Sequence, residues 1–101
     1  MGKFYKNKAT KYHPSYEIEN NGKTWTNLEL TDSPTNSGRY IKLTRNPNPK
    51  KSGSPAYLRK YVRKDKIGTK GELLKGYELS KYDKKVVDEY LKNHEKAKKN
   101  S

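Results

Sequence analysis

The chain has no cysteine, and this absence excludes both a disulfide framework and a metal site built on thiolates. Its two histidines, His13 and His94, are too few for a metal cluster, so we expect neither a metal ion nor another cofactor. No apolar run approaches the length of a membrane span or a signal peptide. These absences predict a soluble, cytoplasmic protein without a membrane partner.

Apolar residues are scarce as well, at 29% of the 101 residues against 35% that are charged. Methionine, phenylalanine and tryptophan occur once each, whereas tyrosine occurs nine times. A chain of this length forms one domain at most. Its core must be small and must draw on tyrosine rings, which bury well while keeping a polar end wet.

Acidic residues are missing from a long central part of the chain. The sequence has 24 basic and 11 acidic residues, a net charge of +13, and no acid lies between Asp32 and Asp65. Such a field favours a polyanionic partner, and nucleic acid is the commonest one. The alternative is that the lysines only keep a small protein soluble.

Alternating apolar and polar residues predict two β-strands around a polar loop. Thr24–Thr31 alternates with Leu28 and Leu30 on one side, as in a strand with one buried face. Arg39–Arg45 repeats the pattern. Between them, Asp32–Gly38 is a run of turn formers that is too long for a tight hairpin. We expect the working face of a small β domain at this loop.

Two further strands are expected, one on each side of this pair. Tyr16–Glu19 alternates after Pro14 and ends at the turn-forming Asn20–Gly22, and Tyr57–Val62 alternates in the same way. Asn46–Pro55 contains three prolines, so it cannot continue a sheet and is expected to be a mobile surface loop.

A helix is expected to close the domain. Ser80 is suited to cap its first turn, with Asp83 three residues later in place of the usual glutamate of a capping box. Apolar side chains then recur at spacings of three and four, which predicts an amphipathic helix over about residues 80–94. Residues 1–10 are expected to form a flexible basic arm, the alternative being a first edge strand pinned by Phe4, and residues 95–101 are expected to form a frayed tail.

These patterns predict a mainly β fold with a C-terminal α-helix (α+β), in which a strongly bent antiparallel sheet of four or five strands packs against the helix. The expected core comprises Tyr16, Ile18, Leu28, Leu30, Ile41, Leu43, Leu58, Val62, Ile67, Leu74, Leu79, Val86, Val87, Tyr90 and Leu91.

Four short motifs follow one another along this fold. They are Lys11-Tyr12-His13-Pro14, Leu28-Glu29-Leu30-Thr31, Tyr61-Val62-Arg63-Lys64-Asp65-Lys66-Ile67, and Leu79-Ser80 before the helix. In this order they resemble the PemK/MazF toxin family. The resemblance implies an SH3-like barrel over residues 11–94 that cleaves single-stranded RNA without a metal. It also implies an acidic antitoxin peptide as a partner, and it allows a homodimer.

The resemblance assigns two catalytic positions. Thr31 matches the catalytic threonine of the family, whereas His13 stands where the family has a catalytic arginine before the proline. The segment Arg39–Pro55 has no counterpart.

Cleavage of RNA by protein groups alone requires a base, an acid and donors that hold the phosphate. Histidine is suited to proton transfer near neutral pH, and arginine can grip a phosphate with two nitrogens. We therefore expect His13, Thr31 and either Arg39 or Arg45 to converge beside the Asp32–Gly38 loop. The alternative is that the histidine is an ordinary surface residue and the threonine caps a turn.

A wider nucleic-acid surface is expected on basic and aromatic residues, namely Lys11, Trp25, Arg39, Lys42, Arg45, Lys50, Lys51, Arg59 and Arg63. Rings interleaved with basic residues can stack bases while the cations follow the backbone, although about half of these rings are expected in the core. Two functions stay open at this point. One is an endoribonuclease, and the other is a non-catalytic nucleic-acid- or protein-binding module of a mobile element.

Overall fold

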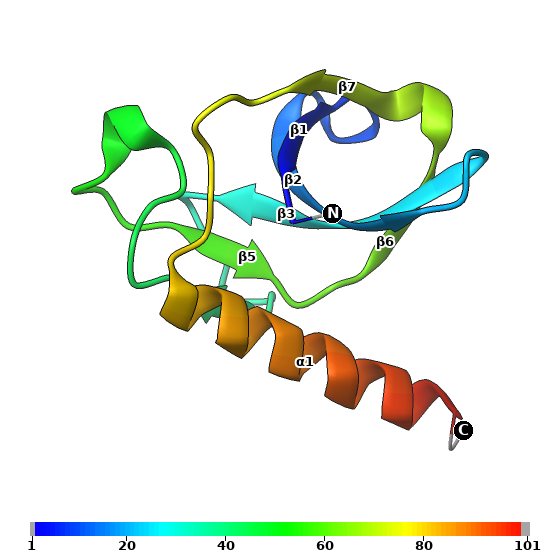
Figure 1. The fold of residues 1–101 in the computed structure, drawn as a ribbon. Coiled ribbons are helices and arrows are strands. Elements are labelled where there is room, and N and C mark those ends of the chain that lie inside the picture. The colour runs from blue at the N-terminus through cyan, green and yellow to red at the C-terminus, as the bar shows by residue number, and fades with distance from the viewer. Residues whose placement is uncertain (1, 100–101) are drawn as a thin grey trace.

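The computed structural model describes residues 2–99, with side chains as far as Lys96, and consists of seven strands, three short 3-10 turns and one long helix (Figure 1). The strands are β1 (Phe4–Asn7), β2 (His13–Asn20), β3 (Thr24–Thr31), β4 (Tyr40–Lys42), β5 (Tyr57–Arg59), β6 (Arg63–Lys66) and β7 (Lys70–Leu73). The helix is α1 (Lys81–Lys99), and the turns are η1 (Lys8–Thr10), η2 (Pro49–Lys51) and η3 (Ile67–Thr69).

All strand pairs are antiparallel, in the order β4-β5-β3-β2-β1-β7, and β6 also pairs with β3. Two strands therefore share the edge of β3 that lies opposite β2. Thr24–Asn27 pairs with β6, and Leu30–Thr31 pairs with β5. The sheet curls strongly, but no pairing joins β6 to β7 within residues 2–99, so it does not close. An antiparallel, mainly β fold with one C-terminal helix is confirmed.

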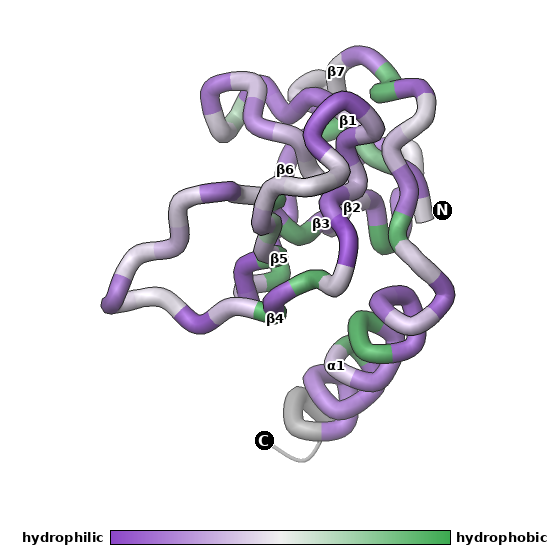
Figure 2. Tube along the Cα trace, turned by 90° about the vertical axis from the view of Figure 1, so that its left-hand side faces the viewer, coloured by the Kyte–Doolittle hydropathy of each residue, from purple (hydrophilic) through white to green (hydrophobic). Residues whose placement is uncertain are grey.

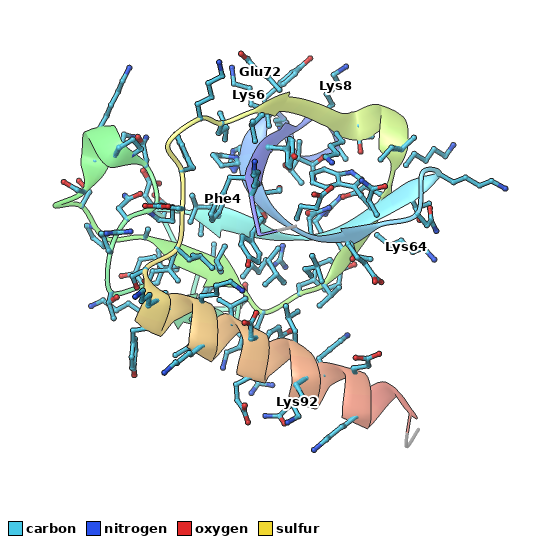
Figure 3. The ribbon with its side chains drawn as sticks, in the orientation of Figure 1. Phe4, Lys6, Lys8, Lys64, Glu72 and Lys92 are labelled. Carbon is cyan, nitrogen blue, oxygen red and sulfur yellow. The ribbon has the colours of Figure 1, made fainter. Side chains whose placement is uncertain are left out.

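The N-terminal segment was expected to be an arm, and this prediction was wrong. Residues 4–7 form β1, which lies between β2 and β7 inside the sheet. Phe4 is fully buried, with its ring centroid 5.2 Å from that of Tyr16 and 6.0 Å from that of Tyr77 (Figure 3). The burial of this ring outweighs the preference of the surrounding lysines for solvent.

β3 buries opposite faces in its two halves, whereas a single buried face along the strand was predicted. Leu28 and Leu30 face the hydrophobic core, and Trp25 and Asn27 are enclosed by the curl of the sheet. The indole Nε1 of Trp25 donates a hydrogen bond to Thr69 Oγ1 at 3.0 Å. Trp25 is therefore a structural residue and cannot stack a base, contrary to its predicted place in the nucleic-acid surface.

The interior of the curl is polar. Asp65 Oδ2 accepts hydrogen bonds from the side-chain amides of Asn7 at 3.2 Å and Asn27 at 3.0 Å, and its carboxylate pairs with Arg63 at 3.0 Å. Nearby, Glu17 and Lys70 form a second, largely buried ion pair. The two pairs lie on strands β2, β6 and β7, so they stabilise the curl from within.

α1 begins after Ser80, whose hydroxyl accepts a hydrogen bond from the Asp83 amide at 3.1 Å. The Asp83 side chain is 1% exposed and does not complete a capping box. It accepts hydrogen bonds from the Thr44 amide at 2.9 Å and the Arg45 amide at 3.3 Å, which anchors the helix to the chain after β4. Val87, one turn further along, is fully buried in the core.

The helix continues to Lys99. The prediction of a frayed tail over residues 95–101 was therefore wrong for residues 95–99, and residues 100–101 lie outside the described part. Nothing after residue 94 breaks a helix, because Glu, Lys and Ala are strong helix formers. No helix in the described residues is long and apolar enough to cross a membrane.

Of the predicted core residues, all but one lie in the hydrophobic core or pack against it. Ile67 is the exception, since it opens η3 away from this cluster. The core also contains Phe4 and Ala56, which were not predicted. The predicted strand Tyr57–Val62 ends at Arg59, where the chain turns before entering β6.

Candidate nucleic-acid interface

The sheet has an outer face on the side of β3, β5 and β4 that points away from α1. Leu30, Leu58 and Ile41 are cross-strand partners and belong to the core beneath the helix. Because side chains alternate along a strand, the neighbouring partners Thr31, Tyr57 and Lys42 lie on the opposite face. The next row on this outer face holds Arg59 and Tyr40, which are also cross-strand partners.

The outer face combines aromatic rings with cations. Tyr40 and Tyr57 are half-buried and meet edge to face, with ring centroids 6.3 Å apart. Lys42 and Arg59 are exposed and make no ion pair with the described side chains. The guanidinium of Arg59 also lies 5.4 Å from the ring centroid of Tyr61, which is 55% exposed. Such a surface suits a single strand with exposed bases and phosphates.

The loop between β3 and β4 borders this face and extends away from α1 (Figure 2). The amide of Thr35 donates a hydrogen bond to the Tyr40 hydroxyl at 3.3 Å, and the Thr35 hydroxyl lies at the same distance. These two contacts lower the pKa of Tyr40. At Gly38 an added Cβ would lie 2.5 Å from the Tyr40 ring, so only glycine lets the loop approach so closely.

His13, at the start of β2, pairs with a residue that the sequence did not indicate. Its Nδ1 lies 3.3 Å from Glu29 Oε2, and the two side chains are 53% and 20% exposed. The Thr31 hydroxyl accepts a hydrogen bond from the Ser33 amide at 3.1 Å, which leaves its proton free to be donated. A carboxylate beside one imidazole nitrogen orients the ring and leaves Nε2 for a ligand.

A pocket of about 210 Å³ opens where β2 begins and β3 ends. His13 and Thr31 both line it, as predicted, together with Asp32. The opposite wall is formed by Asn46, Asn48 and Lys51 from the loop before β5.

No protein-family model, curated protein or solved structure matches this chain. Its function must therefore be inferred from the residues that the fold brings together.

The predicted arginines do not reach the pocket, and this part of the hypothesis was wrong. Arg45 lies on the far side of the Asn46–Pro55 loop, where its Nη2 is 3.8 Å from Glu78 Oε1. Arg39 lies near Tyr90 of α1 instead. Burial raises the pKa of the Tyr90 hydroxyl, and the positive charge of Arg39 opposes this rise. Lys51 is the cation that lines the pocket instead.

The remaining predicted residues are spread over the molecule. Arg63 is engaged by Asp65 inside the curl, so it is not free to hold a phosphate. Lys50 lies in η2, next to the pocket wall. Lys11 lies in the turn before β2 with a φ of 56°, followed by Tyr12 with a φ of 68°. Lysines also point outward on other sides of the molecule, as Figure 3 shows for those it labels, namely Lys6, Lys8, Lys64 and Lys92.

Glu29 could have been found only from the strand register. The pairing of β2 with β3 places Ser15 opposite Glu29, but it contains an irregularity between Glu17 and Glu19. A regular hairpin counted back from the Asn20–Gly22 turn would therefore give the wrong partners.

Proposed function

We propose that the protein binds single-stranded RNA across the outer face of β3, β5 and β4. The observation that carries the proposal is the cross-strand row of Thr31, Tyr57 and Lys42, with Tyr40 and Arg59 beside it. The two tyrosines offer ring surface to bases, and Lys42 and Arg59 offer charge to phosphates. The acid-free stretch between Asp32 and Asp65 supplies Tyr40, Lys42, Tyr57 and Arg59, whereas Thr31 and the acidic Glu29 on the same side of β3 precede it.

Cleavage of the bound strand is a second candidate, and the His13–Glu29 contact favours it. In this route His13 Nε2 takes the proton of a 2′-hydroxyl, and the resulting oxygen attacks the adjacent phosphorus. As the bond between phosphorus and the 5′-oxygen breaks, that oxygen takes a proton from water and His13 returns its own proton to solvent, giving a 2′,3′-cyclic phosphate and a 5′-hydroxyl. The Thr31 hydroxyl and the Lys51 ammonium stabilise the phosphate charge. Without cleavage, the same face serves as a binding module for nucleic acid or protein, as in a mobile element.

We further propose that the curled sheet is a divergent SH3-like barrel related to PemK/MazF toxins. The closing helix and the position of Thr31 at a strand end support this proposal. An acidic antitoxin peptide, a homodimer and a cytoplasmic location would accompany it.

The proposal can be tested by fluorescence anisotropy with a long unstructured RNA in EDTA. We expect Tyr57→Leu to weaken binding about 5- to 150-fold, because stacking of a base contributes about 1–3 kcal/mol. The double variant Lys42→Ala/Arg59→Ala should weaken binding and make the log–log salt slope shallower by about 1.4, which is about 0.7 for each phosphate contact.

The matched control is Lys85→Ala/Lys92→Ala, which removes the same charge from exposed positions on α1. If this control weakens binding as much as the outer-face variant does, the proposed interface is wrong. Gel analysis of the same samples tests cleavage. Cleavage products that form with the wild type and disappear in both His13→Ala and Glu29→Gln would support catalysis. If the wild type binds the RNA and leaves it intact, the protein is a binding module without nuclease activity.

A further inference from the structure

We propose that the pocket beside His13 binds a single guanine base. This inference rests on the proposed function, because it places one base of the bound RNA in the pocket while the neighbouring strand crosses the outer face. The wall, the floor and the polar edge of the pocket each favour a base.

The wall is held in place before any ligand binds. Asn46 is buried, its Oδ1 accepts a hydrogen bond from the Asn48 amide at 3.0 Å, and its Nδ2 donates to the Ser54 carbonyl at 3.3 Å. At the base of the loop, the Leu43 amide donates to the Ala56 carbonyl at 3.0 Å. The segment is therefore tied internally rather than being the mobile loop that its prolines predicted. A preorganised wall reduces the entropic cost of binding.

The floor is apolar and suits a flat ring. Leu30, Ala56, Pro14 and Tyr77 line it, and the Tyr77 ring is backed by Phe4. The volume of about 210 Å³ is below the range of about 300–1,000 Å³ that drug-sized ligands occupy. A pocket of this size and lining fits one base.

The polar edge selects among the bases. Among the described residues, Asp32 is the only carboxylate that lines the pocket, and its Oδ1 accepts a hydrogen bond from the Ser33 hydroxyl at 3.0 Å. Oδ2 has no hydrogen bond to the part of the chain that the structure describes. On the opposite wall, Asn48 Oδ1 accepts from the Lys50 amide at 3.0 Å, so its amide nitrogen is left to donate.

Guanine matches this pair of groups better than the other bases do. Its N1–H and N2–H₂ are adjacent donors for a carboxylate, and its O6 accepts a hydrogen bond from an amide. Adenine and cytosine present a ring-nitrogen acceptor to the carboxylate, and uracil presents one N–H between two carbonyl oxygens. Because adenine and cytosine each offer one amino donor, Asp32 can accept two adjacent hydrogen bonds from guanine and at most one from each of the other bases.

The test is a titration of the ¹⁵N-labelled protein with each of the nucleotides GMP, AMP, CMP and UMP, followed by NMR. We expect GMP to shift the amide resonances around Asp32 and Asn48 and to bind at least about tenfold more tightly than the others, which is within the discrimination of a bidentate base contact. Asp32→Asn should remove this preference, and Asp88→Asn, an exposed carboxylate on α1, should retain it. Equal binding of all nucleotides, or no binding of GMP, would overturn the inference.

A second arm distinguishes guanine in RNA from a free guanine nucleotide. It uses 2′-O-methyl oligouridine with and without one guanosine, so that cleavage cannot interfere. If the pocket reads RNA, the guanosine-containing strand binds more tightly than both the plain strand and GMP. Lys42→Ala/Arg59→Ala then weakens both strands and leaves GMP binding intact. Selective GMP binding without binding of either strand would refute the proposed RNA function and support the guanine site. Equal binding of both strands without GMP selectivity would refute the guanine site and support the RNA function.

Discussion

At the scale of single residues, the polar interior of the curled sheet depends on one carboxylate. Burial alone would raise the pKa of Asp65, but hydrogen bonds from Arg63, Asn27 and Asn7 outweigh it, and the net shift is downward. The same contact with Asp65 raises the pKa of Arg63, although burial opposes the rise. Both shifts mean that the charged pair is more favourable in the folded protein than in the unfolded chain.

We predict that Asp65→Asn lowers the free energy of unfolding by about 2–3 kcal/mol at neutral pH, because it leaves Arg63 without its charged partner. A depressed pKa stabilises the fold above the unfolded value of about 3.9 and loses this contribution as pH falls through the lower folded value. The gap between wild type and variant should therefore shrink in acid. Urea unfolding at neutral pH and at a pH below the folded pKa of Asp65 measures this difference in the free energy of unfolding. Asp88→Asn is the exposed control. A gap that is equal at both pH values would contradict this account.

At the scale of elements, β1 joins the edge strand β7 to the rest of the sheet. It pairs with β2 on one side and with β7 on the other, and Phe4 fills the space under the connection to α1. The Leu74 amide donates a hydrogen bond to the Phe4 carbonyl at 2.9 Å. The backbone and the ring of Phe4 therefore both contact the segment that leads to α1.

Phe4→Ala is expected to destabilise the protein by about 3–5 kcal/mol, the usual cost of removing a buried phenylalanine ring. Lys3→Ala, at the exposed neighbouring position, should stay within about 0.5 kcal/mol of wild type. Thermal or urea unfolding followed by circular dichroism makes the comparison. Equal stability of the two variants would show that β1 does not contribute to the core and would support a flexible N-terminal arm.

At the scale of the whole molecule, the net charge of +13 acts against compactness. The radius of gyration is 13.1 Å. Electrostatic repulsion extends over about 30 Å at 0.01 M salt and over only about 10 Å at 0.1 M. At low salt, like charges on opposite sides of the molecule therefore repel one another.

Sodium chloride should consequently have opposite effects on folding and on binding. Raising it from about 0.01 M to about 0.1 M should increase the melting temperature by a few degrees, because self-repulsion is screened. The same change should weaken RNA binding, because the release of counterions into a more concentrated salt solution gains less entropy. Differential scanning fluorimetry and anisotropy in matched buffers give both trends, and a melting temperature that falls over this range would contradict the first.

Much of the fold follows from local patterns in the sequence. The alternation in Thr24–Thr31, the turn at Gly22 with its φ of 87°, and the cap at Ser80 each appear in the structure as expected. These features depend on residues that are close together in the chain, so their physical causes can be read from it.

What could not be predicted depends on residues that are distant in the chain. Phe4 becomes a core residue only because Tyr77 comes to lie against it, and Asp83 binds the Thr44 amide across the helix–sheet junction. The contact of Glu29 with His13 depends on a register that an irregular pairing conceals. Charge pattern alone likewise could not distinguish Lys51, which lines the pocket, from Arg45, which turns away from it.

The shared edge of β3 has a consequence for how the molecule opens. Since β6 holds one half of this edge and β5 the other, either partner can detach while β2 still holds the strand. We therefore expect two subglobal openings with separate free energies, one in the curl and one in β4 and β5. The pocket lies at the boundary between them, so an opening of the second kind would widen it for an incoming base without disturbing the ion pairs inside the curl.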